Sequence, residues 1–260
     1  MSSSSGTLKI ALVLIGNELL SGKIVDENGP YVARRLREVG ADLLRIVVIP
    51  DDMDTIVEEL KRSQTAYDVV ITSGGVGPTH DDITLAAVAK ACGRKTVLDP
   101  VLEGFIRSVF KEKTTADHLR MGTIPEGSDL IDAGPSTWPI VSIDGMYILP
   151  GVPQIFRKKF EAIIERFRVG VWYLRNVYLN AEEGIIAQLL AELEDRFEVY
   201  VGSYPIWRGA DHRVRVTVES RRPAPVNQAV ETLLAELASE QVVRVDAPVT
   251  DADAPPTSAN

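Results

Sequence analysis

Residues 68–82 read DVVITSGGVGPTHDD, and this stretch decides the fold. The run DVVIT (Asp68–Thr72) has the length and apolar content of a buried strand. The glycine-rich segment SGGVGPTHDD (Ser73–Asp82) follows it, and a helix is predicted from about Asp81 to Ala91. A strand, a glycine loop and a helix in this order are typical of a parallel α/β sheet, whose ligands bind at the carboxyl ends of its strands.

The chain before this stretch shows the same alternation of strand and helix. Strands are predicted at Leu8–Ile15 and Leu43–Ile49, and helices at about Asn28–Val39 and Asp51–Ser63. The segment Gly16–Asp26 is expected as a polar turn. Each strand is followed by a helix, which implies parallel strands joined by right-handed crossovers.

The chain after the glycine loop is predicted to complete this domain. A strong hairpin signal joins Ile140–Ile143 to Met146–Leu149 through Asp144–Gly145. The other expected elements are an amphipathic helix, a loop region with one short helical piece, and a last helix, at Pro100–Phe110, Thr114–Gly134 and Gln154–Phe167. The sequence thus predicts a three-layer α/β/α domain with a mostly parallel sheet over residues 8–168.

A second, smaller α+β unit is predicted over residues 171–246. Its order is strand, helix, strand, strand, helix, strand, at Leu174–Leu179, Glu182–Asp195, Phe197–Gly202, Val214–Glu219, Val226–Glu240 and Val242–Val245. This βαββαβ order resembles the split βαβ arrangement. Residues 1–7 and 247–260 are expected to be disordered tails, because they are rich in small and polar residues.

Composition excludes several classes of protein. The 260 residues are 45% hydrophobic and 25% charged, as in an ordinary globular protein, and the net charge is −9. This charge argues against a general nucleic-acid or membrane-surface binder, which needs an excess of Lys and Arg. No apolar stretch is long enough to span a bilayer, and Cys92 is the single cysteine, so we expect a cytoplasmic protein without an internal disulfide.

The glycine loop has the composition of an anion-binding site. Gly74, Gly75 and Gly77 lack Cβ atoms and permit positive φ, so the backbone can curl and direct its N–H groups inward. Pro78 stiffens the turn, and the Thr79 hydroxyl can donate to an anion. The amino terminus of the following helix favours negative charge. The sequence therefore predicts a site for the phosphate of a small molecule.

Asp81 and Asp82 close this loop, and their presence beside a phosphate has two explanations. Mg²⁺ commonly joins one or two carboxylates to the phosphates of a substrate, so the pair is a candidate metal site. Alternatively, one aspartate caps the helix and the other is solvated. Spacing by itself leaves these two explanations open. Asp51 and Asp52, which follow the second strand, are expected to cap a helix.

Four segments carry a family resemblance. SGGVGPTHDD resembles the GGxGPTxDD signature of the molybdopterin-binding-like domain in the competence/damage-inducible protein A (CinA) family, which is related to MogA and MoaB. The segments IGNELLSGKIVDEN (Ile15–Asn28), HLRMGTIPEG (His118–Gly127) and YILPGVPQIF (Tyr147–Phe156) match other motifs of that family. WPIVSIDGMYILPGVP and VYVGSYPIW followed by VRVTVES resemble a subgroup related to the amino-terminal half of eukaryotic FAD synthetase.

The resemblance implies a MogA-like fold and a metal-dependent hydrolase. Its substrate would be the pyrophosphate bond of a nucleotide such as ADP-ribose or FAD, with Mg²⁺, Mn²⁺ or Co²⁺. The implied catalytic residues are Asp81, Asp82 and Glu18, and the implied metal ligands are Asp81, Asp82 and Asn17. The implied phosphate- and ligand-binding residues are Ser73, Gly74, Gly75, Gly77, Pro78, Thr79, Asp26, Asn28, Pro150 and Gly151.

One position departs from the family pattern. Residue 17 is Asn where the family usually has Asp, although an Asn carbonyl can still coordinate a hard cation. The alternative function is therefore a binding protein that holds molybdopterin, a related pterin or a nucleotide without cleaving it. Asp26 and Asn28 have the simpler alternative of shaping the turn and capping the helix, and Arg120 either neutralises a distal phosphate or pairs with a surface carboxylate. The resemblance also implies a homo-oligomer.

Overall fold

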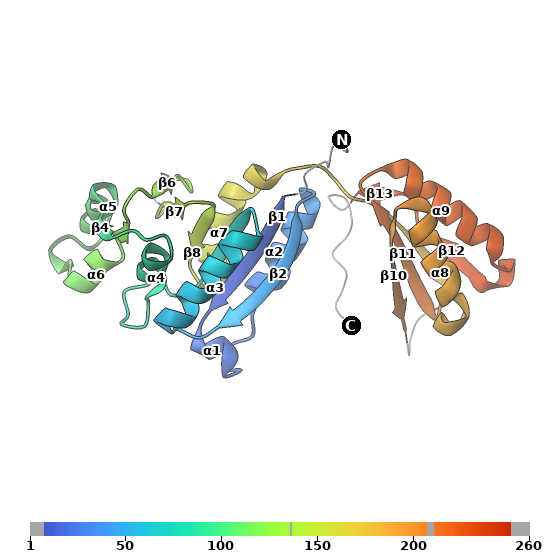
Figure 1. Cartoon of the computed structure of the whole chain (residues 1–260), viewed down its shortest axis with the longest axis horizontal. Coiled ribbons are helices and arrows are strands. Elements are labelled where there is room, and N and C mark those ends of the chain that lie inside the picture. The colour runs from blue at the N-terminus through green and yellow to red at the C-terminus, as the bar shows by residue number, and fades with distance from the viewer. Residues whose placement is uncertain (1–7, 136, 207–210, 251–260) are drawn as a thin grey trace. The chain divides into compact units, whose positions relative to one another are not determined.

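The protein is described by a computed structural model, which covers residues 8–135, 137–206 and 211–250. The chain divides into two compact units (Figure 1). The first comprises the chain up to residue 36 and residues 41–169, and the second comprises residues 37–40 and the chain from residue 170. The tails predicted at residues 1–7 and 251–260 lie outside the described residues. Within the described ranges no helix is long and apolar enough to cross a membrane.

A six-stranded mixed sheet forms the centre of the first unit, in the order β2-β1-β3-β8-β7-β6. The strands β2, β1, β3 and β8 pair in parallel, and β7 pairs antiparallel with β8 on one side and β6 on the other. The strands are β1 (Lys9–Ile15), β2 (Asp42–Ile49), β3 (Val69–Ser73), β6 (Asp129–Ile131), β7 (Ile140–Ile143) and β8 (Met146–Leu149). The predicted α/β class with a mostly parallel sheet is confirmed.

Apolar runs explain why these strands lie in the middle. Every residue of β1 from Ile10 to Ile15 is at most 2% exposed, as expected for a strand that is covered on both faces. The predicted β7–β8 hairpin is also present. Its turn residues Asp144 and Gly145 both have positive φ, which matches the twist of the two flanking strands.

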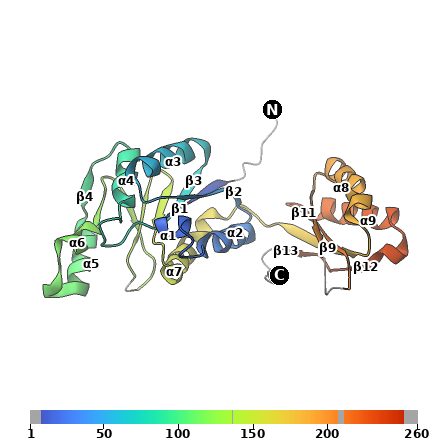
Figure 2. The same cartoon turned by 90° about the horizontal axis from the view of Figure 1, so that it is seen from below.

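Helices cover both faces of this sheet, α3 and α4 on one side and α2 and α7 on the other (Figure 2). Their bounds are α2 (Asn28–Glu38), α3 (Met53–Ala66), α4 (Thr84–Ala91) and α7 (Pro153–Ile163). The helix predicted from Asp81 therefore begins three residues later. Its first hydroxyl, on Thr84, donates to the Gly74 carbonyl at 2.9 Å, so residues up to 83 are held in the loop.

Five further elements among the described residues belong to the first unit. They are α1 (Asn17–Leu20), β4 (Thr96–Leu98), α5 (Pro100–Phe110), α6 (Ala116–Arg120) and β5 (Thr123–Pro125), with single 3-10 turns at Lys111–Lys113 and Ile164–Phe167. Two predictions of irregular structure are corrected here. The polar turn at residues 16–26 contains α1, and the loop region at residues 114–134 contains β5 and β6. Both strands have three residues and exist through pairing with β4 and β7, which short local patterns do not reveal.

The second unit has the predicted βαββαβ order. It contains β9 (Tyr173–Leu179), α8 (Glu183–Phe197), β10 (Tyr200–Pro205), β11 (Val214–Ser220), α9 (Pro223–Glu236), a 3-10 turn (Ser239–Gln241) and β12 (Val242–Val245). The antiparallel order β10-β11-β9-β12 is that of a split βαβ fold. The disordered tail expected from residue 247 is wrong at its start, because β13 (Val249–Thr250) pairs with β9.

Candidate functional site

A cavity of about 540 Å³ lies in the first unit at the carboxyl ends of β1, β3 and β8. Residues that follow these three strands line it, as expected for a ligand site in an open α/β sheet. Ten of the predicted site residues take part: Glu18, Asp26, Asn28, Ser73, Gly74, Gly75, Gly77, Asp82, Pro150 and Gly151. The predicted residues Asn17, Pro78, Thr79 and Asp81 are not among the lining residues.

The glycines of the loop are required by close contacts with the backbone and with side chains. Gly74 has φ +112° and Gly75 has φ +63°. A Cβ atom at Gly74 would lie 2.1 Å from the Ile15 carbonyl oxygen, and one at Gly77, where φ is not positive, would lie 2.6 Å from an Asp82 carboxylate oxygen. Only a residue without a side chain can therefore pass this close to β1 at Gly74 and this close to Asp82 at Gly77.

The same loop has backbone N–H groups that are without a partner in the described residues. The Gly74 N–H donates to the Leu149 carbonyl at 3.1 Å. The next three N–H groups, of Gly75, Val76 and Gly77, make no hydrogen bond within the described residues. All three residues line the cavity. Successive free N–H groups in a glycine-rich turn bind anions, so the geometry supports the predicted phosphate cradle.

Asp82 stabilises the loop from inside. One of its carboxylate oxygens accepts the Thr79 backbone N–H at 2.8 Å and also the Thr79 hydroxyl. Its second oxygen has no hydrogen-bond partner in the described ranges. Asp82 thus combines a structural role in the loop with a place in the cavity wall. The predicted helix cap is wrong for both aspartates, because α4 begins after Ile83 without a side-chain cap.

Asp81 points elsewhere. Its side chain is 57% exposed and lies 4.0 Å from the ring of His80, itself 97% exposed. Two adjacent acids at a turn point in different directions, and here only Asp82 lines the cavity.

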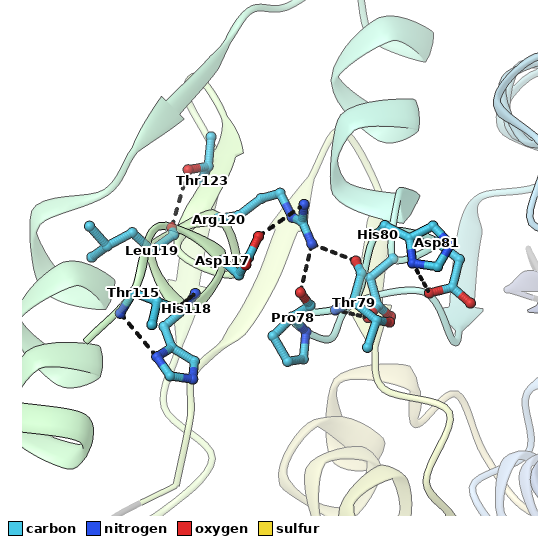
Figure 3. A network of polar contacts seen from close by, with 11 residues as sticks. Pro78, Thr79, His80, Asp81, Thr115, Asp117, His118, Leu119, Arg120 and Thr123 are labelled. Carbon is cyan, nitrogen blue, oxygen red and sulfur yellow. Dashed lines mark hydrogen bonds and ion pairs between the residues drawn. The ribbon is translucent and has the colours of Figure 1, made fainter. Parts of the chain in front are cut away.

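Arg120 fastens the loop from outside (Figure 3). Its guanidinium donates to the carbonyl oxygens of Pro78 and Thr79 at 2.6 and 2.5 Å, and it lies 3.5 Å from Asp117 within α6. Both alternatives considered for Arg120 are therefore incomplete, because its main partners are two backbone carbonyls of the glycine loop. A guanidinium suits this role, since its fork can donate to two acceptors at once.

Asn28 is the buried centre of the site. Its amide N–H₂ donates to the Ser73 hydroxyl at 2.9 Å and to the Gly151 carbonyl at 2.8 Å, which joins the ends of β3 and β8. Its carbonyl oxygen Oδ1 is buried and has no partner in the described part of the chain. A buried acceptor without a partner costs free energy, and a ligand donor or a cation would satisfy it.

Asp26, not Asn28, caps α2. The Asp26 carboxylate accepts the backbone N–H of Asn28 at 2.9 Å and that of Gly29 at 3.0 Å. The predicted cap at Asn28 is therefore wrong, because Asn28 is already helical and directs its side chain toward β3 and β8. Asp52 caps α3 as predicted, through the Thr55 N–H at 2.9 Å.

The predicted metal ligands do not gather into one cage. Within the described residues no group of three or more His, Cys, Asp or Glu side chains could hold a metal ion. Asp51 accepts the Asn17 backbone N–H at 2.7 Å, and Asn17 does not line the cavity. The cavity is nevertheless lined by Glu18 and Asp82, and the unpartnered Asn28 oxygen lies buried in its wall. Such a donor set fits a cation that arrives with the phosphates of a ligand, as Mg²⁺ commonly does.

Lys159 is a lining residue that the sequence interpretation missed. It lies on α7, is 4% exposed, and donates from Nζ to the Pro139 carbonyl at 2.9 Å. Burial lowers its pKa to about 8. Its neighbours Phe156, Phe160 and Ile163 form the buried face of the same helix. A lysine on the apolar face of an amphipathic helix is the signal that could have revealed it.

Comparisons with known proteins match each of the two units to a family. Residues 11–168 match the family described as "Probable molybdopterin binding domain", and residues 171–246 match "FAD synthase, middle domain". A protein of Archaeoglobus fulgidus is 32% identical over 199 residues, which cover 76% of this chain and 86% of that protein.

Two further relatives have informative names. A "Probable FAD synthase" of Caenorhabditis elegans is 30% identical across 91% of this chain and 51% of its own length, so this chain spans about half of it. The crystal structure of the protein CinA of Thermoplasma acidophilum superposes with a TM-score of 0.56 and 29% identity, covering 61% of this chain and 98% of that one. The chain therefore belongs to the family described as "Probable molybdopterin binding domain", and its second unit is similar to the middle domain of FAD synthases.

Proposed function

We propose that this protein binds a phosphate-bearing nucleotide in the cavity and, with a divalent cation, hydrolyses its pyrophosphate bond. Free ADP-ribose and FAD are the candidate substrates. The observation that carries the proposal is a run of three N–H groups without partners in the described residues, at residues 75–77, in one cavity with the carboxylate residues Glu18 and Asp82. The first group suits phosphate oxygens, and the second suits a hard cation.

In this proposal the glycine loop would hold the phosphates, and Asn28 and Asp82 would hold the cation. Mg²⁺, Mn²⁺ or Co²⁺ would polarise a phosphoryl oxygen and lower the pKa of bound water. Glu18 lines the cavity, and its carboxylate makes no hydrogen bond in the described ranges, so it is free to accept a proton from water. Water adds to one phosphorus and the bridging P–O bond breaks, which yields two phosphomonoesters.

The test is release of nucleoside monophosphate from ADP-ribose or FAD by the purified protein with each metal in turn. We expect turnover by the wild type and a loss of about 100-fold or more in Glu18→Gln. Glu58→Gln is the matched control, because it is the same substitution at an exposed position of α3, outside the cavity. Turnover that is absent in the wild type, or equal in Glu18→Gln and Glu58→Gln, contradicts the proposal.

A second candidate is a protein that binds a nucleotide or a pterin such as molybdopterin without cleaving it. The observation that favours it is the lack of a three-carboxylate cluster among the described residues. Calorimetry separates the two candidates. Tight binding of ADP-ribose or FAD with no product in the presence of all three metals supports this second function.

A further inference from the structure

The cavity separates its charges between two ends. Four carboxylates follow β1 and β3, namely Glu18, Asp26, Glu27 and Asp82. Lys159 is the one cation among the described lining residues, and it lies beside Pro139 at the start of β7. In the sheet β8 separates β3 from β7. The start of β7, whose neighbouring Pro139 carbonyl accepts from Lys159, therefore lies about two strand spacings, roughly 10 Å, from the strand that carries the glycine loop.

The Lys159 ammonium has donors to spare. An ammonium carries three N–H donors, and the Pro139 carbonyl accepts one of them. No carboxylate forms an ion pair with it in the described part of the chain. Burial without an anion is costly for a positive charge, and it lowers the pKa of this group to about 8. A ligand acceptor at this point would recover part of that cost.

The surroundings of Lys159 suit a ring better than a phosphate. Trp138 and Pro139 line this end, together with Val141 and Ile148, which are paired across β7 and β8. Apart from the Lys159 ammonium, the indole N–H of Trp138 is the one side-chain donor in this set, and none of the others can compensate phosphate charge. The free N–H groups for a phosphate lie at the glycine loop. A mononucleotide bound by its phosphate at that loop would extend its base toward Lys159.

We propose that Lys159 selects ligands whose heterocyclic ring carries an oxo group, so that of the two candidate substrates it favours FAD, whose isoalloxazine carries oxo groups, over ADP-ribose, whose adenine carries none. The inference rests on the proposed binding of a phosphate at the glycine loop. An ammonium donates and never accepts, so an oxo oxygen facing Lys159 gains a charge-assisted hydrogen bond. An exocyclic amino group in the same place would point its own N–H donors at those of the ammonium. The ammonium would then gain no acceptor beyond the Pro139 carbonyl. A site built to hydrogen-bond one group rejects the analogue that lacks it.

Inosine and adenosine monophosphates test this inference, because they share the phosphate, the ribose and the purine frame. They differ at C6, which carries an oxo group in the first and an amino group in the second. By calorimetry at pH 7 we expect the wild type to bind inosine monophosphate at least about tenfold more tightly. Lys159→Met should abolish this preference and retain the affinity for adenosine monophosphate. Lys158→Met, which removes the neighbouring exposed charge on α7, should leave both affinities unchanged.

A pH series on the wild type gives a second readout, which needs no variant. The preference for inosine monophosphate should decline as the pH rises from 7 to 8.5, because Lys159 titrates near pH 8 while the inosine ring is still largely neutral. Equal weakening of both nucleotides in Lys159→Met would make Lys159 a phosphate anchor and overturn the inference. No preference in the wild type would also overturn it. Intact preference without hydrolysis of ADP-ribose or FAD would contradict the proposed hydrolysis and leave the role of Lys159 standing.

Discussion

At the scale of single residues, burial of Lys159 has a consequence for stability as well as for binding. Its pKa is about 8 in the folded protein and 10.5 as the ordinary value of a lysine. Below pH 8 the group is charged in both the folded and the unfolded state, and its desolvation lowers the free energy of unfolding. Between pH 8 and 10.5 the unfolded chain binds more protons, so the free energy of unfolding rises with pH.

We therefore expect the Lys159 contribution to the free energy of unfolding to rise by about 2 kcal/mol between pH 7 and 9.5. Urea denaturation of the wild type and Lys159→Met at several pH values checks this. The difference in free energy of unfolding between the two proteins should change by that amount over this pH range. At pH 7 Lys159→Met should be the more stable protein. Lys158→Met should follow the wild type. A constant difference would show that Lys159 keeps an ordinary pKa.

At the scale of elements, the glycine loop depends on α6. The loop is held by Asp82 from within and by Arg120 from α6, through the carbonyls of Pro78 and Thr79. Neither contact touches the cavity donors at residues 75–77 directly. Their effect on a ligand would come from the position of the loop, and small displacements of a binding group can reduce affinity considerably.

Arg120→Ala should therefore weaken the binding of a nucleotide by roughly tenfold while changing the free energy of unfolding by less than about 1 kcal/mol. Calorimetry with ADP-ribose in the absence of metal measures the first quantity, and urea denaturation the second. Arg107→Ala is the control, because Arg107 forms an exposed pair with Glu103 on α5 at 2.7 Å. Identical affinities of the two variants would mean that the loop keeps its shape without α6.

At the scale of the whole molecule, the cavity belongs to the first unit. All its lining residues fall between Leu14 and Lys159, outside the segment 37–40 that groups with the second unit. Each unit also has its own apolar core. That of the first is built on β1, β3, β7 and β8, and that of the second on β9, β11, α8 and α9. Separate cores are what allow separate folding.

A fragment of residues 8–169 should thus bind a nucleotide with the affinity of the full chain, within about threefold. A fragment of residues 170–250 should unfold cooperatively in urea and bind none. Calorimetry and circular dichroism on the two fragments check both statements. Loss of binding in a folded 8–169 fragment would assign part of the site to the second unit.

The sequence by itself determined the elements whose signals are local. Buried strands such as β1 and β3 are continuous apolar runs, the β7–β8 turn needs positive φ, and the glycine loop needs positions without Cβ atoms. The order of these elements then restricts the fold, because parallel strands need crossover helices.

The tertiary structure decided which side chains meet. Asp81 and Asp82 are adjacent in sequence, yet only Asp82 lines the cavity, because the loop stays irregular until Thr84 bonds back to Gly74. Lys159 enters the site from a helix 77 residues after Asp82. The direction of a side chain and its burial depend on packing between distant segments, and neither quantity is present in the local pattern of residues.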